Sequence, residues 1–341
     1  MSSPHIAQAP SVGHIMTRVL LALTPAIAAY VYAFGTAILI SLTIATLTAI
    51  LAESFMLRLR RYPILPFLRD GSAVVTAWLL ALALPPLAPW WLIVIGVAFA
   101  LIVAKHLYGG LGNNLFNPAM VGFAVLMISF PAYMNHWLAP AALAQAHLSF
   151  GGELRYMFSG ALPPGIHLDA INMATPLDTL RTELHRQLTV GEIMKLPIYT
   201  AIGGQGSMLI AFATLLGGLY LLFTRIISWH VPVAFLGGLF LIASAFYTGD
   251  PSRFAAPWFH LMAGGAMLGA FFIATDPVSG ATTPRGKLIF GLGIGLLTYI
   301  IRALGGYPDG VAFAVLLMNA AVPLIDAYTQ PPVFGQKEDA P

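Results

Sequence analysis

The sequence contains no cysteine among its 341 residues. This absence excludes disulfide bonds, thiolate nucleophiles and zinc sites built on cysteine. It also excludes an iron–sulfur cluster held by this chain alone, because such clusters are bound by cysteine thiolates. Redox chemistry in this protein would therefore require an organic cofactor.

Charge is also scarce. Asp, Glu, Lys and Arg make up 9% of the residues and 58% are hydrophobic, whereas about a quarter of a soluble domain is charged. This balance predicts an all-α polytopic membrane protein. The net charge of +3 is small, and the basic residues lie between apolar runs, so we expect a lipid bilayer and no nucleic acid as the partner. The first residues lack the pattern of a cleaved signal, so the first apolar run is expected to remain as a span.

Apolar runs predict about ten transmembrane helices, because about 20 apolar residues are needed to cross a bilayer. Glycine pairs lie inside three of these runs, at 217–218, 237–238 and 264–265, and we expect them to allow close helix packing. The predicted spans are 17–34, 36–57, 71–88, 90–105, 117–134, 199–224, 230–248, 256–275, 287–304 and 311–328.

Basic residues predict the orientation of the spans. They cluster in connections that share one side if the spans alternate, and the positive-inside rule makes this side cytoplasmic, with both chain ends. Arg253 and Arg302, in or beside outer turns, are exceptions. The residues predicted on the cytoplasmic side are Arg18, Arg58, Arg60, Arg61, Arg69, Lys105, His106, Arg225, Arg285 and Lys287.

The opposite side receives one long polar segment, residues 135–197. Loops of this length are usually functional or disordered, and the mixed charges, aromatic residues and Pro-Gly turns of this one indicate order. Within it, "PLDTLRTELHRQL" has the amphipathic spacing of a short helix that begins near Pro176.

An internal echo predicts two repeats. "YGGLGNNLFNPAMVGFAVLM", before and into the fifth span, resembles "LGGYPDGVAFAVLLMN", before and into the tenth. Two halves of five spans would have opposite orientations, as in many transport proteins, and broken helices are expected at 109–117 and 305–310. The predicted parts are a five-helix repeat at 1–134, an extracytoplasmic flavin-bearing loop at 135–197, an inverted five-helix repeat at 198–328 and a cytoplasmic tail at 329–341.

Two stretches place an aspartate ahead of an Ala-Thr pair at the same spacing. "DPVSGAT", from Asp276 to Thr282, resembles the acceptor motif on which bacterial flavin transferases esterify FMN to a threonine. "DAINMAT", from Asp169 to Thr175, has Asn and Met where the motif has Ser and Gly. On the string alone, Thr282 is the better match.

Four motifs resemble one family of membrane proteins, which holds the D subunit of the Rnf ion-translocating electron-transport complex and the B subunit of the sodium-pumping NADH:quinone reductase. The resemblance covers almost the whole chain and implies a flavoprotein subunit of the bacterial inner membrane. It further implies FMN linked by a phosphoester to a threonine in an exported loop, and a non-covalent riboflavin in the membrane part. The motifs are "DPVSGATTPRGKLIFG", "IRALGGYPDGVAFAVLLMNAAVPLID", "GGLGNNLFNPAMVGFA" and "ATPLDTL".

The resemblance also implies partners. Such a complex moves electrons between ferredoxin and NAD and couples this transfer to movement of Na+ or H+. Iron–sulfur subunits, the flavin-bearing G subunit and the A and E membrane subunits of the Rnf complex would accompany this chain, and a flavin transferase would mature it. The chain would be one relay of an oxidoreductase complex, so no catalytic residue is expected in it.

The predicted sides of the membrane separate the two threonines. The basic residues that follow Thr282 place it in the cytoplasm, whereas the resemblance implies a flavin on the exported side. Thr175 lies in the outer loop, and the acceptor of the family resembles the "ATPL" found there. We therefore expect FMN on Thr175, with Asp169 and Ala174 as the rest of the acceptor motif.

The hydroxyl residues Ser279, Thr282 and Thr283 then have two interpretations. They could shape a cytoplasmic turn that caps the ninth span. They could instead cradle a second, non-covalent flavin, because turns at helix starts present free N–H groups.

Five polar residues near membrane depth could line an ion path, because polar side chains inside a bilayer usually face a cavity. Alternatively, they could satisfy backbone groups that broken helices leave free. The histidines lack the spacing of metal ligands, so no metal site is expected. The five candidates are Asn113, Asn114, Asn117, Asp309 and Asn319.

Two other functions fit parts of the pattern. A solute channel or permease would also have inverted repeats with broken helices, but it has no need of a long loop with an Asp-to-Thr acceptor spacing. A structural membrane scaffold for redox subunits is the second alternative. Covalent flavin on the chain would distinguish the electron-transfer function from a permease. Loss of electron transfer with intact assembly in Thr175→Ala would distinguish it from a scaffold.

Overall fold

The structure is a computed structural model, and it describes residues 11–330. These residues form helices and connecting turns, without a β-strand. Five of the helices are long and apolar enough to cross a membrane, which confirms the predicted all-α, multi-pass membrane class. They are α1 (Val12–Phe34), α2 (Ala37–Leu59), α13 (His230–Gly249), α16 (Pro284–Leu304) and α17 (Val311–Thr329).

Shorter apolar helices occupy the other predicted spans, so every one of the ten predicted windows contains helix. The ten-span count itself and the inversion of the repeats stay predictions. The shorter elements are α4 (Ser72–Ala83), α5 (Trp90–Ala98) with its π-helical continuation η1 (Phe99–His106), α6 (Pro118–Ser129), α12 (Ser207–Phe223), α14 (Pro257–Met262), α15 (Ala266–Leu268) and the π-helical η2 (Gly269–Ile273).

The lengths of α4 and α6 follow from residues at their ends. Gly71, in the left-handed region at φ 74°, precedes α4, and a Pro-Pro pair follows it. The Asn117 side chain caps α6, which ends before Pro131. Each helix has 12 residues, so each is about 18 Å long, whereas the hydrocarbon layer is about 30 Å thick. In a bilayer, at least one end of each helix would therefore lie at membrane depth and need polar partners.

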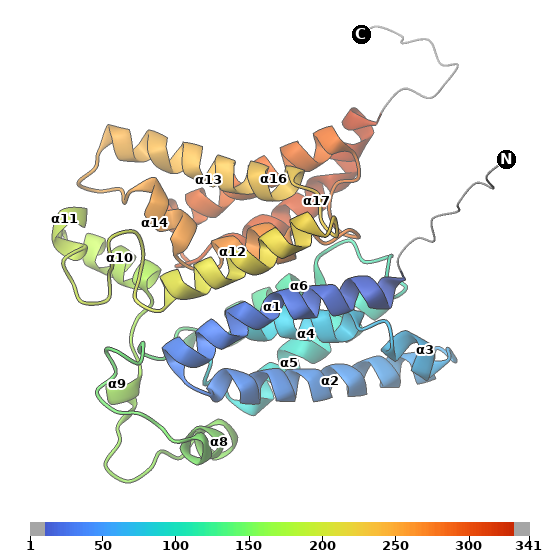
Figure 1. Ribbon diagram of the computed structural model, residues 1–341, viewed down its shortest axis with the longest axis horizontal. Helices are drawn as coiled ribbons and strands as arrows, with labels where there is room; N and C mark the ends of the chain where they lie inside the picture. The colour runs from blue at the N-terminus through green and yellow to red at the C-terminus, as the bar shows by residue number, and fades with distance from the viewer. Residues whose placement is uncertain (1–10, 331–341) are drawn as a thin grey trace, which may run out of the picture.

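The helices form two bodies that lie side by side in Figure 1. One body holds α1, α2, α4, α5 and α6, and the other holds α12 to α17. The bodies meet where α1 packs on α12 and where α6 packs on α17. In the predicted repeats these are the two first spans and the two last spans, so the contact between the bodies pairs corresponding helices.

The eighth predicted span is not continuous, because the helix is interrupted at Gly264–Gly265. Gly264 has φ +64° and separates α14 from α15. A side chain at Gly264 would be strained by this backbone and would also collide with Leu177 and Asp309. The two glycines therefore make a break in the helix, and the missing side chain at Gly264 leaves room for Leu177 and Asp309.

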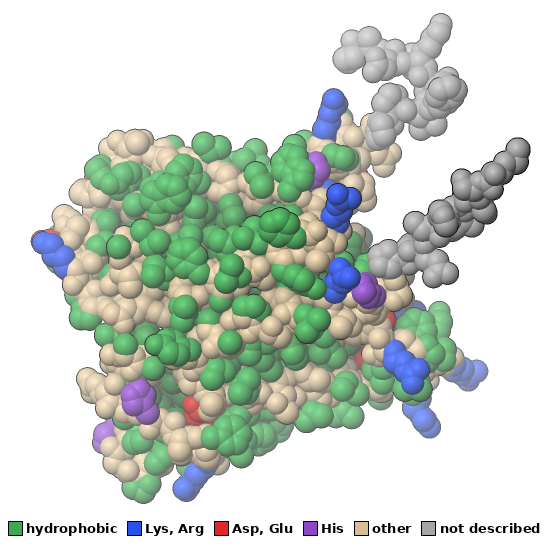
Figure 2. Space-filling model, in the orientation of Figure 1, with side chains coloured by type: hydrophobic (Ala, Val, Ile, Leu, Met, Phe, Trp, Pro, Cys, Tyr) green, Lys and Arg blue, Asp and Glu red, His purple; other side chains and the backbone are tan. Residues whose placement is uncertain are grey.

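The two ends of the bundle differ in composition. The loop 135–197 folds over one end, which we call the loop end (Figure 1). Most of the Lys and Arg side chains visible in Figure 2 lie at the other end, which we call the basic end. The remaining short helices are α3 (Ile64–Leu68) at the basic end, and α7 (Pro131–Met134), α8 (Phe150–Ser159), α9 (Leu168–Ile171), α10 (Pro176–His185) and α11 (Val190–Ile193) at the loop end.

The loop is attached to the bundle through a buried carboxylate on α8. Glu153 accepts hydrogen bonds from the hydroxyl of Thr36 and from the backbone N–H groups of Thr36 and Ala37, at the start of α2. A carboxylate is favoured there because the first N–H groups of a helix lack partners within the helix. Burial raises the pKa of Glu153, and these hydrogen bonds act against that increase.

This raised pKa predicts that α8 docks less firmly as pH rises. The folded state holds the Glu153 proton more tightly than the unfolded state does, so the stabilisation is complete below the ordinary pKa of 4.5 and declines as pH passes through the raised value. Hydrogen exchange of residues 150–159 should show a protection ratio, wild type over Glu153→Gln, that falls as pH rises from 4.5 through the raised pKa of Glu153. A ratio that stays constant over this range would contradict the prediction.

Candidate functional site

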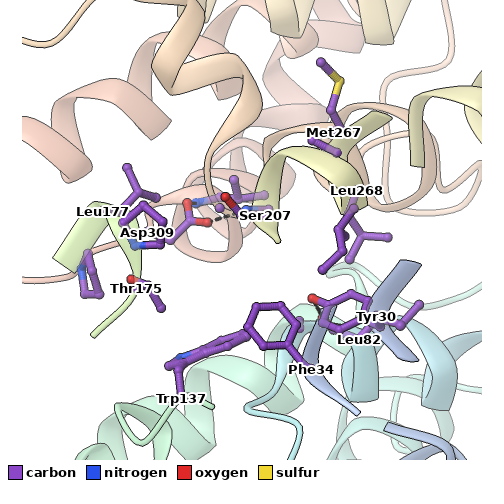
Figure 3. A pocket seen from close by; sticks show the side chains of 18 of the residues that line it. Tyr30, Phe34, Leu82, Trp137, Thr175, Leu177, Ser207, Met267, Leu268 and Asp309 are labelled. Carbon is purple, nitrogen blue, oxygen red and sulfur yellow. Dashed lines mark hydrogen bonds between the residues drawn. The ribbon is translucent and has the colours of Figure 1, made fainter. Parts of the chain in front are cut away.

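A large cavity lies between the two bodies and reaches the loop end. It encloses about 1400 Å³, counting its open mouth. Its walls come from α1, α6, α12, the broken span and the loop, and they are mostly apolar and aromatic. Tyr30, Phe34 and Trp137 are among the aromatic side chains that surround it in Figure 3. A mostly apolar cavity with few polar groups is typical of a binding site for a small organic molecule.

Thr175 lines this cavity. It is half-buried and is the N-cap of α10, where its Oγ1 accepts a hydrogen bond of 3.2 Å from the N–H of Asp178. α10 begins at Pro176, as the amphipathic spacing predicted, and the helix is fixed there by the proline and by this cap. The threonine oxygen is therefore held on a rigid helix start at the edge of an apolar cavity (Figure 3).

The two other residues of the predicted acceptor motif lie differently. Ala174 is exposed and also borders the cavity, so only a small side chain precedes the threonine. Asp169 is exposed on α9, and among the described residues its side chain has no hydrogen bond or ion pair. The structure brings Ala174 and Thr175 together at the cavity and leaves Asp169 apart.

The second motif forms a tightly bonded turn at the basic end. Ser279 is buried and donates to the Asp276 carboxylate at 2.7 Å. Thr282 donates both its N–H and its hydroxyl to Asp326 of α17, each at 3.0 Å. Thr283 caps α16 by accepting from the N–H of Gly286. These contacts are typical of a turn that starts a helix. They support the first interpretation of Ser279, Thr282 and Thr283, a turn that caps the ninth span.

Three of the five candidate ion-path residues lie close to this turn. Asn117 donates to the carbonyl of Ile273, and its own N–H donates to the Oδ1 of Asn319 at 3.0 Å. Asn319 in turn donates to the carbonyl of Ser279, and Asn114 donates to the carbonyl of Phe116. These contacts engage backbone groups beside broken helices, so they support the second interpretation of the asparagines.

The remaining two candidates lie elsewhere. Asn113 is exposed beside Gly109. Asp309 lies at the loop end, where it borders the cavity and forms an ion pair of 3.0 Å with Arg302. Arg302 has a side chain that is 1% exposed, and the sequence analysis assigned it no role in a site. The signal that could have identified it was a charged residue inside a predicted span, which usually marks a function or a specific partner.

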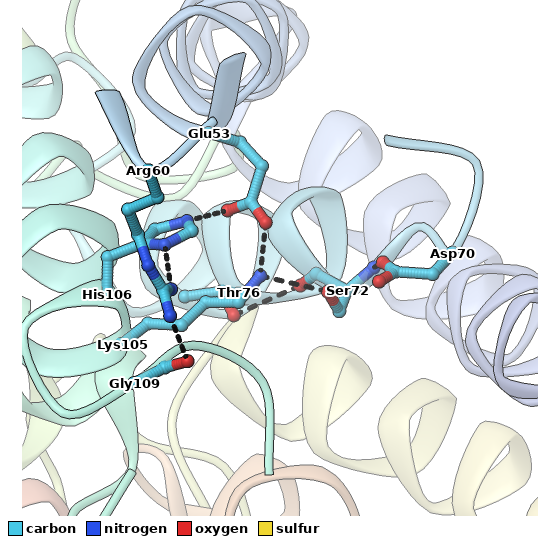
Figure 4. Close-up of polar contacts among 8 residues, drawn as sticks. All are labelled: Glu53, Arg60, Asp70, Ser72, Thr76, Lys105, His106 and Gly109. Carbon is cyan, nitrogen blue, oxygen red and sulfur yellow. Dashed lines mark hydrogen bonds and ion pairs between the residues drawn. The ribbon is translucent and has the colours of Figure 1, made fainter. Parts of the chain in front are cut away.

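A second buried charge cluster lies inside the first body near the basic end (Figure 4). Glu53 of α2 pairs with Lys105 at 2.8 Å and with His106 at 3.0 Å, both from η1. Lys105 also donates to Ser72 at 3.0 Å, and Arg60 contacts His106 from the rim. Lys105 and His106, which were predicted on the cytoplasmic side, are buried near the basic end, where a carboxylate on α2 compensates their charge inside the bundle.

Removing the Glu53 carboxylate should destabilise the protein strongly. In Glu53→Gln the ammonium of Lys105 loses its counter-charge in a buried position, at a cost of about 3–5 kcal/mol. Unfolding in mixed detergent micelles would measure this loss. The control is Glu183→Gln, which breaks a surface pair with Arg186 and should cost about 0–1 kcal/mol. Equal effects of the two substitutions would contradict the prediction.

The helices and the cavity define a class: a multi-pass helical membrane protein in which a threonine of a long loop borders a cavity between two helical bodies. Residues 1–335 match the model of the NQR2, RnfD, RnfE family. The chain therefore belongs to this family, which confirms the resemblance inferred from its motifs.

Similar proteins occur in several bacteria. A protein of Aliivibrio salmonicida is 50% identical over 344 residues, covering 99% of this chain and 98% of its own. One of Yersinia enterocolitica is 51% identical, covering 98% of each chain, and one of Aeromonas salmonicida is 50% identical, covering 95% of this chain and 94% of its own. Each of these relatives is named as the D subunit of an ion-translocating oxidoreductase complex.

Proposed function

We propose that this chain is a membrane subunit of a complex that couples electron transfer to translocation of Na+ or H+, and that it relays electrons through FMN on Thr175. The observation that carries the proposal is the position of Thr175, whose hydroxyl lies at the edge of the cavity between the two bodies. The names of the relatives support the complex-level part of the proposal, because they describe an ion-translocating oxidoreductase.

The cavity suits a flavin by its lining, which is mostly apolar and aromatic with a few polar groups. Trp137 and Phe34 offer flat apolar surfaces, whereas Ser207, Gln205 and Asp309 offer a few polar groups. A bound flavin supplies the electron chemistry. The residues of this chain hold it, keep water from its apolar face and set its orientation from the fixed threonine.

The hydroxyl of Thr175 is also placed for attachment. Thr175 is half-buried rather than enclosed, and the exposed Ala174 precedes it, which favours access for a transferase from the loop end. The N–H of Asp178 already donates to this oxygen, and the N-terminus of α10 favours the negative charge of a phosphoester. Thr282 is exposed, but Asp326 accepts hydrogen bonds from both its N–H and its hydroxyl.

The proposal includes the remaining assignments that the family resemblance implied. The loop end would face the exterior of the bacterial inner membrane, with both termini in the cytoplasm. The partners would be the iron–sulfur subunits, the flavin-bearing G subunit, the A and E membrane subunits, and a flavin transferase. A non-covalent riboflavin would lie in the membrane part. The hydrogen-bonded turn at Ser279 to Thr283 supports a structural role there rather than a cradle for this riboflavin.

The direct test is a peptide map. The chain is produced together with its flavin transferase, run on a denaturing gel under ultraviolet light, and then digested for mass spectrometry. We expect a fluorescent band and the mass of FMN on the peptide that contains Thr175. A chain without covalent flavin would overturn the electron-transfer proposal and would favour a solute permease, which a cavity between two helical bodies would also suit.

A further inference from the structure

The broken span presents backbone groups that a continuous helix would have paired. The carbonyls of His260 and Ala263 lie at the end of α14, and the N–H of Gly265 precedes α15. Inside a membrane protein such groups need partners from elsewhere, because lipid offers none. Two charged side chains supply them.

Arg302 and Asp309 form hydrogen bonds with the backbone groups on the two sides of the break. The guanidinium of Arg302 donates to the carbonyl of His260 at 2.6 Å and to that of Ala263 at 3.1 Å. Asp309 Oδ2 accepts from the N–H of Gly265 at 2.6 Å, while its Oδ1 accepts two further N–H bonds from Arg302. The five N–H donors of an arginine suit this task, because they can serve carbonyls and a carboxylate together.

The turn between α16 and α17, which contains Asp309, also holds α10, the helix that Thr175 caps. Arg181 of α10 donates to the carbonyl of Gly306, three residues before Asp309. Leu177 of α10 is buried directly against Gly264, because a Cβ placed there would lie 2.6 Å from the Leu177 side chain and would also collide with Asp309 Oδ2. The start of α10, the break and the Arg302–Asp309 pair therefore form one packed unit on the cavity wall.

We propose that Arg302 and Asp309 are positioning residues, which hold the broken span against α10 and thereby fix the cavity wall beside Thr175. A pair of charges is used because the break places donors and acceptors only a few residues apart in a buried position. Without the pair, the carbonyls and the N–H group of the break would lose their partners, and the wall would reorganise.

The absence of cysteine allows a clean accessibility test. Leu177→Cys introduces a single thiol on α10 at a site that is 5% exposed, and its labelling by a water-soluble maleimide reports opening of the unit. We expect slow labelling with the pair intact. Adding Asp309→Asn should accelerate labelling by about tenfold, the factor expected for loss of one hydrogen bond to a charged group. Arg302→Lys, which keeps the charge without the fork of donors, should give an intermediate rate.

The matched control is Asp250→Asn, also at the loop end, where the carboxylate interacts with Ser252 and Arg253 of its own turn. It should leave the labelling rate unchanged. If Asp309→Asn does not accumulate in the membrane, Arg181→Gln tests the same unit from α10 and should also accelerate labelling. Slow labelling in whichever of these two variants folds would overturn the proposal.

A second readout rests on the proposed function. If FMN on Thr175 occupies the cavity, Asp309→Asn removes a negative charge from its wall and should raise the midpoint potential of the flavin, whereas Asp250→Asn should not. If labelling is faster but the midpoint potential is unchanged, the pair stabilises the cavity wall without influencing the flavin. That result would overturn its role as a pair of positioning residues for the flavin. A chain without covalent flavin would defeat the proposed function alone, because the labelling arm needs no cofactor.

Discussion

Thr175→Ala should abolish the fluorescent flavin band completely, while the chain still accumulates in the membrane. The effect is all-or-none because the phosphoester needs the side-chain oxygen, and alanine has none. Loss of the hydroxyl also removes the N-cap of α10, at a cost of about 1 kcal/mol, which is small beside the packing of the bundle. In-gel fluorescence under ultraviolet light measures the flavin, and an epitope tag measures the chain.

The matched control for this prediction is Thr282→Ala. It changes the same residue type in the better string match, at the basic end, and the band should persist at full intensity. Electron transfer by the complex should be lost only in Thr175→Ala. A band that disappears in Thr282→Ala and persists in Thr175→Ala would reverse the assignment of the acceptor. A band that is lost in neither would place the flavin on another residue.

Gly217→Ala should prevent the two bodies from packing together. A Cβ at Gly217 would lie 1.9 Å from the carbonyl oxygen of Ala22, so α12 would have to move away from α1. Because backbone cannot yield as a flexible side chain does, we expect a loss of about 3 kcal/mol, the upper range of overpacking. Thermal unfolding in detergent and the yield of folded chain would measure the loss.

Gly237→Ala is the control, because it makes the same substitution inside another long apolar helix. Gly237 belongs to another predicted glycine pair, in α13, but no atom lies within 4 Å of the position that its Cβ would take. The substitution should be neutral or should stabilise by about 0.5–1 kcal/mol, because alanine has less backbone entropy to lose in a helix. Similar losses in the two variants would indicate that glycine is needed for a reason other than the α1–α12 contact.

Local signals account for the part of the fold that the sequence could predict. Apolar runs fixed the places of the helices, and Pro176 with the amphipathic residues after it fixed the start of α10. The segments rich in glycine before Asn117 and Asp309 were expected to interrupt helices, and the chain is non-helical just before both α6 and α17. Each of these features depends on neighbours within about one or two helical turns.

Pairings between distant residues could not be predicted in this way. The burial of Lys105 was not predicted, because its counter-charge, Glu53, lies 52 residues earlier in the chain. The break at Gly264 was missed because apolar residues surround it and because its stabilising partners, Arg302 and Asp309, belong to other elements. Such contacts depend on the three-dimensional arrangement, which hydropathy and spacing do not contain.

The candidate site was predicted in part for a different reason. Thr175 was selected by its predicted side of the membrane, against a better string match at Thr282, and the structure places it at a cavity. The cavity itself has no signature in the sequence. It is assembled from the loop, α1, α6, α12 and the broken span, which come from widely separated parts of the chain.

The short helix α6 also determines how far the cavity lies from the cluster of buried asparagines. Met120 and Ile273 line the cavity, and the carbonyl of Ile273 accepts the hydrogen bond from Asn117. From Asn117 to Met120 is three residues, or about 4.5 Å along the helix. About one helical turn thus separates the cavity lining from the buried asparagines Asn117 and Asn319, so the cap of α6 and the cavity wall share one turn of the helix.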